Sequence, residues 1–198
     1  MTNALHTDSG RTNDRNNRTN IRTLTLISLM TAVTCILGPL TLPLPISPIP
    51  LSLATFAIYL SVYILGMKKG TISCILYLLI GLAGLPVLSG FTGGVGKLLG
   101  PTGGYMIGYV VMALIVGFFI DQYPARPVLQ FIGMILGTVS CYLLGTIWLG
   151  YQAGISFAAA LTAGVLPFIP GDLAKMVFSI YLGYHIRKRL RAAHLISS

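Results

Sequence analysis

Three charged side chains, Lys97, Asp172 and Lys175, stand inside long apolar stretches of the sequence. Taking a charge out of water is costly unless another charge or a polar ligand compensates it. Asp172 and Lys175 lie three positions apart, so in a helix they share one face. These residues are therefore the leading candidates for a site that binds a small polar solute.

The Asp172–Lys175 pair also admits a purely structural role. Pro170 and Gly171 mark the start of a helix, and an aspartate in a first helical turn is favoured by the helix dipole. Asp172 would then be a cap, with Lys175 as its ion-pair partner. A cap alone does not require a lysine in an otherwise uncharged helix, where leucine would cost less. Both roles stay open here, and we favour binding.

The other unusual segment is the glycine-rich stretch 88–105, LSGFTGGVGKLLGPTGGY. It is not a phosphate-binding P-loop, because Phe91 and Leu98 occupy two required positions of that motif. It is not a dinucleotide-binding turn either, because Leu99 replaces the last glycine. Glycines let the backbone approach a ligand closely. We expect a re-entrant outer loop that brings Thr92 and backbone amides to a mostly apolar pocket.

Catalysis has little support in the sequence. No serine or cysteine has a plausible base beside it, and no group of side chains has metal-ligand spacing. The histidines lie away from the three charges, at His6, His185 and His194. The cysteines lie far apart in separate apolar segments, at Cys35, Cys74 and Cys141. We expect a protein that is not an enzyme, without catalytic residues, cofactor or metal.

The elements that must position the candidate site are membrane helices. Of 198 residues, 55% are apolar and only 9% are charged, against about a quarter in soluble domains. Six apolar segments are expected to be helices: 24–38, 51–66, 71–88, 104–120, 128–149 and 171–186. Several are shorter than the ~20 residues of a perpendicular span, which a bundle with irregular ends tolerates. The predicted fold is an all-α integral membrane protein with six transmembrane helices.

The basic residues give the expected orientation and explain the net charge of +9. They flank the first and last segments and the second and fourth connections, at Arg11, Arg15, Arg18, Arg22, Lys68, Lys69, Arg126, Arg187, Lys188, Arg189 and Arg191. All of these positions then fall on one side, which is cytoplasmic by the positive-inside rule, so both termini are cytoplasmic. This pattern argues against a nucleic-acid partner and for the inner (plasma) membrane. We expect a disordered basic tail over residues 1–22, a membrane domain over 23–190 and a tail over 191–198.

Small and aromatic residues complete the predicted interfaces. Small residues four positions apart let helices approach closely in lipid. We assign two such pairs to packing within the bundle, Gly104 with Gly108 and Gly133 with Gly137, and expect Ser28 and Ala32 to face an external partner as well. Aromatic residues near the outer helix ends belong mostly to the interface belt, and one or two of them are expected to stack on a ligand: Tyr105, Tyr142, Trp148 and Tyr151.

Three motifs in order resemble the BioY family. They are Gly90-Phe-Thr-Gly-Gly, Leu99-Gly-Pro-Thr-Gly-Gly-Tyr105 and Pro170-Gly-Asp-Leu-Ala-Lys175. Members of that family are biotin-binding S components of energy-coupling factor (ECF) vitamin importers. The resemblance covers nearly the whole chain after the N-terminal tail. It implies an outward-facing biotin pocket formed by the outer loops and the ends of the later helices.

The resemblance also implies particular contacts and a partner. The segment Gly90–Gly94, with Thr92 and Gly93, would contact biotin together with Asp172 and Lys175. An ECF module, made of one transmembrane coupling subunit and two ATPases, would dock partly at Ser28 and Ala32. Some relatives have Asn in place of Thr92 and Arg in place of Met106, so Lys97 is a candidate replacement for the missing cation. A self-sufficient facilitator or channel is the alternative to a binding subunit.

Overall fold

The computed structural model describes residues 4–42, 50–193 and 195. In chain order the elements are α1 (Ala4–Leu37), β1 (Thr41–Leu42), β2 (Leu51–Ser52), α2 (Ala54–Leu65), α3 (Met67–Leu82), α4 (Val95–Leu98), α5 (Gly103–Gln122), α6 (Pro127–Ala153), α7 (Phe157–Gly164), the 3₁₀ turn η1 (Leu166–Phe168) and α8 (Ile169–Ala192). The two short strands pair antiparallel. The fold is otherwise helical, as predicted.

Each of the six apolar segments coincides largely with one helix: α1, α2, α3, α5, α6 and α8. Among the described residues, four helical stretches are long and apolar enough to cross a membrane: Asn20–Leu37, Gly103–Gln122, Pro127–Ala153 and Phe157–Ala192. Helices α2 and α3, with 12 and 16 residues, are shorter than the ~20 residues of a perpendicular span. The structure therefore gives a multi-pass membrane protein, in which α2 is mostly buried and α3 keeps one apolar face exposed.

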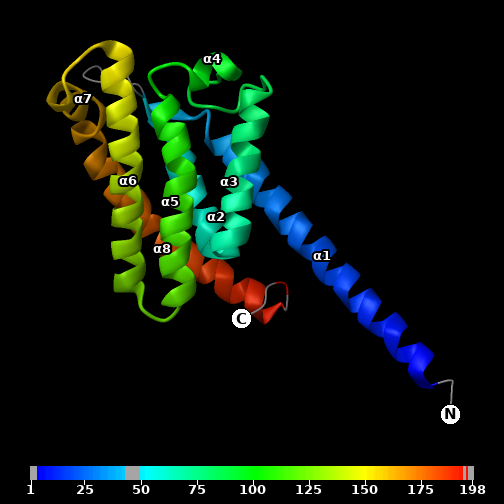
Figure 1. The fold of residues 1–198 in the computed structure, drawn as a ribbon. Coiled ribbons are helices and arrows are strands. Elements are labelled where there is room, and N and C mark those ends of the chain that lie inside the picture. Colours follow the sequence, from blue (N-terminus) through cyan, green and yellow to red (C-terminus); the bar gives the residue numbers. More distant parts are fainter. Residues whose placement is uncertain (1–3, 43–49, 194, 196–198) are drawn as a thin grey trace.

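Two boundaries differ from the sequence prediction. Helix α3 ends at Leu82 and not near residue 88, because Gly84 adopts a positive φ of 105° that stops the helix. Helix α1 begins at Ala4, so the backbone of the predicted disordered segment 1–22 is helical from residue 4 onward. In Figure 1 this part of α1 extends beyond the rest of the bundle.

Helices α5 and α6 share the most extensive contact of the described helix pairs, and glycines make this contact possible. A Cβ added at Gly108 would lie 2.9 Å from the Cα of Cys141, and one at Gly133 would lie 2.4 Å from the Cβ of Phe119. Gly104 and Gly137 face the partner helix in the same way. The predicted packing role of these four glycines is confirmed.

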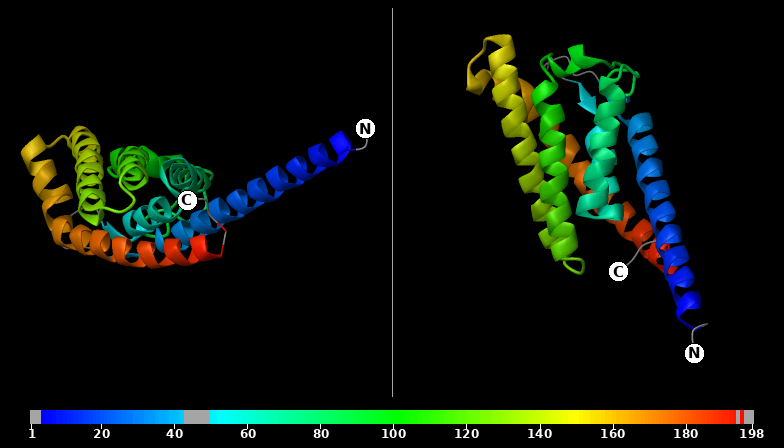
Figure 2. Two further views of the ribbon diagram at one scale, coloured as in Figure 1. Left: turned by 90° about the horizontal axis from the view of Figure 1, so that it is seen from below. Right: turned by 45° about the vertical axis from the view of Figure 1, so that its right-hand side comes forward.

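The bundle has two distinct ends (Figure 1). The glycine-rich segment with α4, and also α7, lie at one end, whereas the α5–α6 turn and the end of α8 lie at the other. Both views in Figure 2 keep α8 alongside the other helices for most of its length. At the second end Asp121 accepts a hydrogen bond from the Met67 backbone N–H at 2.8 Å and lies 3.8 Å from the Arg187 guanidinium. These contacts join the start of α3, the end of α5 and α8.

Candidate binding site

A cavity of about 60 Å³ lies between the start of α2 and helices α3, α5, α6 and α8, near the glycine-rich end. A single water needs about 10–15 Å³ by the same measure, so the space is more than a packing defect. Most of its wall is apolar or aromatic, from Leu51, Tyr77, Leu88, Tyr105, Met106, Tyr109, Met112 and Phe168. A small polar group of side chains, including Asp172 and Lys175, closes one side.

Asp172 and Lys175 form a buried ion pair on the first turns of α8. The Lys175 Nζ lies 2.9 Å from the Asp172 Oδ1, and the two residues are only 8% and 5% exposed. Pro170 stands in the first turn of α8, where its missing N–H has no helical partner to lose. The three-residue spacing then turns both side chains toward the cavity.

Lys175 also binds the segment that precedes α2. Its ammonium donates to the Ser52 backbone carbonyl at 2.6 Å and to the Thr55 hydroxyl at 3.1 Å. The Ser52 hydroxyl in turn donates to the Gly38 carbonyl at 2.9 Å. The three ammonium protons thus meet three acceptors, and the lysine joins α8 to a segment that is over 100 positions earlier in the chain.

The second carboxylate oxygen of Asp172 accepts a hydrogen bond from the Tyr142 hydroxyl on α6. No side-chain cap bond closes the start of α8, where Phe168 is the N-cap residue. The structural role considered for Asp172 had two parts, a helix cap and an ion pair with Lys175. The ion pair is present, whereas a capping bond at the N-cap position is not. The carboxylate is held by an ammonium on one oxygen and a phenol on the other.

Tyr105 forms part of the aromatic wall. Its hydroxyl donates to the Gly164 carbonyl at 3.0 Å, which fixes the ring between α5 and the end of α7. Met106, the next residue, is 5% exposed and also lines the cavity.

The glycine-rich segment covers this end of the bundle and meets the cavity at its two ends, through Leu88 and Ser89 and through Thr102 and Tyr105. Leu88 pairs with Thr92 in a tight turn, in which Gly90 and Phe91 have positive φ angles of 76° and 56°. The Thr92 hydroxyl donates to the Ser89 carbonyl at 2.9 Å. Gly90, Thr92, Gly93 and Gly94 are not among the residues that line the cavity.

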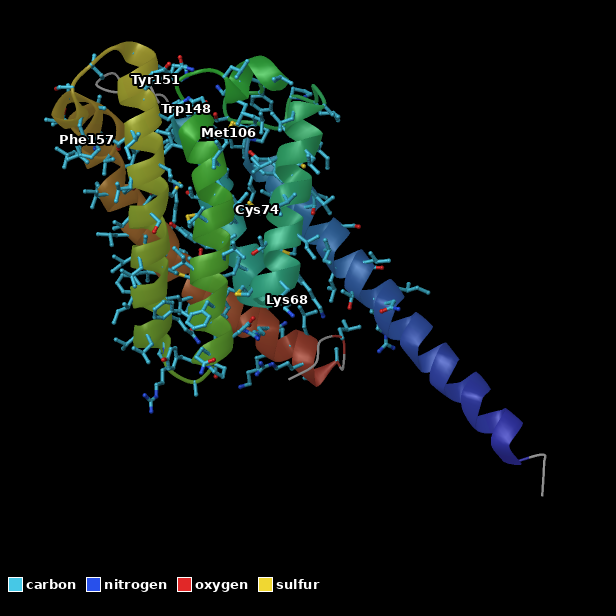
Figure 3. The ribbon with its side chains drawn as sticks, viewed as in Figure 1. Lys68, Cys74, Met106, Trp148, Tyr151 and Phe157 are labelled. Carbon is cyan, nitrogen blue, oxygen red and sulfur yellow. The ribbon has the colours of Figure 1, made fainter. Side chains whose placement is uncertain are left out.

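Lys97 and Tyr151 also lie apart from the cavity. Lys97 is on the short helix α4, where partial burial lowers the pKa of its ammonium. Tyr151, near the end of α6, is 86% exposed, and Figure 3 shows it at the same end of the bundle as Met106 and Trp148. The Trp148 indole donates to the Gly100 carbonyl at 2.9 Å, so it holds the glycine-rich segment.

Of the residues predicted for the site, the structure brings together Tyr105, Asp172 and Lys175 at one cavity, with Tyr142 from the aromatic group. Sequence reasoning missed Ser52 and Thr55. They are ordinary polar residues far from Lys175 in the chain, and no local pattern distinguishes them.

The sequence of the chain is similar to those of one known protein family. The family model described as "BioY family" matches residues 11–192. The chain is 34% identical to the "Biotin transporter BioY" of Lactococcus lactis subsp. cremoris, over 87% of this chain and 94% of that protein. It is 32% identical to the "Probable biotin transporter BioY" of Pyrococcus horikoshii, over 83% and 95% of the two chains.

A solved structure is similar as well. It is described as the "S-component for biotin from an ECF-type ABC transporter". The TM-score is 0.81 with 35% sequence identity, and the match covers 87% of this chain and 94% of that one.

The coupling of the ion pair predicts a non-additive effect on stability. Lys175→Met should lower the free energy of unfolding by about 3–5 kcal/mol, because it leaves the buried Asp172 charge without its cation. The double variant Asp172→Asn/Lys175→Met should lose much less. Thermal unfolding of ligand-free protein in detergent measures both, with Lys68→Met, an exposed lysine at the opposite end, as the charge-matched control. Equal losses in the single and double variants would contradict the coupling.

Proposed function

The chain belongs to the BioY family, and we propose that it is a high-affinity biotin-binding subunit that captures the vitamin for an importer. The names of its relatives and the S component with the same fold support this function. The observation that supports it best within the chain is the buried Asp172–Lys175 pair on one side of an otherwise apolar and aromatic cavity. Pockets for small molecules usually combine such a wall with a few fixed polar groups.

The chemistry of biotin matches this cavity. Its ureido group has two N–H donors and one carbonyl acceptor, which suit the Asp172 carboxylate and the ammonium of Lys175. Its thioether ring and aliphatic chain suit the aromatic wall that includes Tyr77, Tyr105 and Tyr109. The biotin carboxylate needs a cation or amide groups, and we assign it to the glycine-rich end of the cavity, where Ser89 and Thr102 lie in the lining. Gly90–Gly94, with Thr92, and Lys97 belong to the same segment and would have to move toward the cavity to reach it.

We further propose that α1, α2, α3, α5, α6 and α8 all cross the plasma membrane, with both termini in the cytoplasm. Lys68, in the first turn of α3, and Arg126, between α5 and α6, lie at the end of the bundle where α8 ends, as the positive-inside rule requires. The cavity then opens toward the outside of the cell. The short α2 is compatible with a span because neighbouring helices surround it, and the short α3 because its exposed face is apolar.

Packing below the cavity favours a binding subunit over a self-sufficient facilitator or channel. The Tyr59 hydroxyl bonds to Thr138 at 2.6 Å, and the Tyr63 hydroxyl donates to Gln130 at 2.7 Å, one helical turn further along α2. Met112, Met134 and Ile120 fill the space around them and are fully buried. A conducting pore would require a polar, hydrated path through this layer.

Active uptake requires energy from another protein, since the sequence has no complete phosphate-binding motif. An ECF module is the partner we propose. Helix α1 offers it a membrane-facing surface on which Ser28 and Ala32 are exposed next to Leu24, Leu29 and Ile36, which are 64%, 56% and 68% exposed. Small residues at four-residue spacing allow a partner helix to approach closely there.

Titration of the purified protein tests the proposed ligand. Biotin should bind tightly, desthiobiotin more weakly and unrelated vitamins not at all. Asp172→Asn and Lys175→Met should each weaken biotin binding by about 2–5 kcal/mol, because a desolvated charged contact loses one partner. Lys68→Met should bind like the wild type. Unchanged affinity in both cavity variants of folded protein would remove this assignment.

Uptake measurements test the proposed partner surface. Ala32→Trp should strongly reduce biotin uptake by cells that contain the ECF module, because the indole fills the space that a docking helix needs. Equilibrium binding of biotin by the purified variant should stay normal. Ala153→Trp, at an exposed alanine at the end of α6, is the matched control and should leave uptake unchanged. Normal uptake by Ala32→Trp would contradict a docking role, whereas equal loss of binding and uptake would indicate misfolding.

A further inference from the structure

A second hollow, of about 480 Å³, lies on the outer flank of α6, between this helix, α7 and α8. Its wall is almost wholly apolar and includes Ile135, Val139, Leu143, Phe157, Leu161 and Leu173. Val139 and Leu143 are 48% and 50% exposed on a helix that is apolar and long enough to cross the membrane. Figure 3 shows Phe157 at α7, beside the outer end of α6. This hollow therefore opens toward lipid.

The solute cavity and the lipid-facing hollow share one wall. Thr138, Tyr142 and Asp172 line both spaces. Thr138 is bonded to Tyr59 and is 5% exposed, and Asp172 is fixed by Lys175. Tyr142 is half-buried and is the largest of the three side chains, so its ring is the main partition between the two spaces.

We propose that Tyr142 sets the specificity of the proposed biotin site, as a partition that limits ligand size and as a positioning residue for Asp172. The proposal rests on the proposed function of this cavity. The ring separates the solute from hydrocarbon, which keeps the low-dielectric pocket closed on the α6–α8 side. The hydroxyl donates to the Asp172 oxygen that Lys175 does not hold, so the carboxylate keeps one orientation toward the solute.

The two roles have separable consequences. Phenylalanine retains the ring and removes the donor, whereas alanine removes both and joins the cavity to the hollow. A hydrogen bond to a charged group contributes about 1.5–3 kcal/mol, or roughly tenfold to a hundredfold in affinity. Tyr142→Phe should therefore weaken biotin binding by about tenfold to a hundredfold without a change in size selectivity. Tyr142→Ala should change selectivity as well.

The experiment compares three ligands on wild-type, Tyr142→Phe and Tyr142→Ala protein: biotin, a biotin alkyl amide extended at the carboxyl end, and a biotin alkylated on a ureido nitrogen. The proposed pose puts the ureido group at Asp172, which Tyr142 contacts, so the substituent on the ureido nitrogen points toward the partition, whereas the alkyl amide extends toward the glycine-rich end. In Tyr142→Ala at least one enlarged ligand should gain tenfold or more relative to biotin. In Tyr142→Phe neither should gain.

Leu136→Ala, an exposed position on α6 outside both linings, is the control for loss of a large side chain and should leave all ratios unchanged. If Tyr142→Ala and Tyr142→Phe weaken all three ligands in the same proportion, the partition is refuted. If Tyr142→Phe binds biotin like the wild type, the positioning role is refuted. If the wild-type protein does not bind biotin, the failure lies in the proposed function itself, and the assignment of Tyr142 falls with it.

Discussion

An aspartate and a lysine buried among apolar helices give up their hydration, and the surrounding structure has to replace every lost hydrogen bond. In this protein the Lys175 ammonium meets a carboxylate, a hydroxyl and a backbone carbonyl, and the Asp172 carboxylate meets an ammonium and a phenol. The partners come from the β2–α2 segment, from α6 and from α8 itself. Because an unpaired charge in this place would cost several kcal/mol, these segments are constrained to meet at one point.

The helix packing makes that meeting point possible. Glycines such as Gly108 and Gly133 bring α5 and α6 so close that a Cβ atom at either position would collide with the other helix. This contact sets the distance between the aromatic residues of α5 and Tyr142 of α6, across which the cavity lies. Two further buried hydrogen bonds join α2 to α6, from Tyr59 to Thr138 and from Tyr63 to Gln130. The result is a pocket with one polar side, whose polar groups are held by hydrogen bonds, which is the arrangement a binding subunit needs.

The sequence predicts the helices well and the site in part. Long apolar segments separated by glycine, proline and basic residues are strong local signals, and a helix lies at each of them. The Asp172–Lys175 pair could be found because charge in an apolar segment is rare. Its partners Ser52 and Thr55 could not, since only the folded chain brings them to α8 across more than 100 residues. The glycine-rich segment was expected at the pocket, but its turn at Gly90 and Phe91 directs most of it over the end of the bundle.

The most direct test of the central claim is an experimental structure of the protein with biotin bound. The account predicts density for the bicyclic ring in the cavity between α5, α6 and α8, with the ureido group about 2.7–3.2 Å from an oxygen or nitrogen of Asp172 or Lys175. The pair would then exchange or extend its present bonds to include the vitamin. Biotin found elsewhere, with the bonds of Asp172 and Lys175 unchanged and remote from it, would contradict the account.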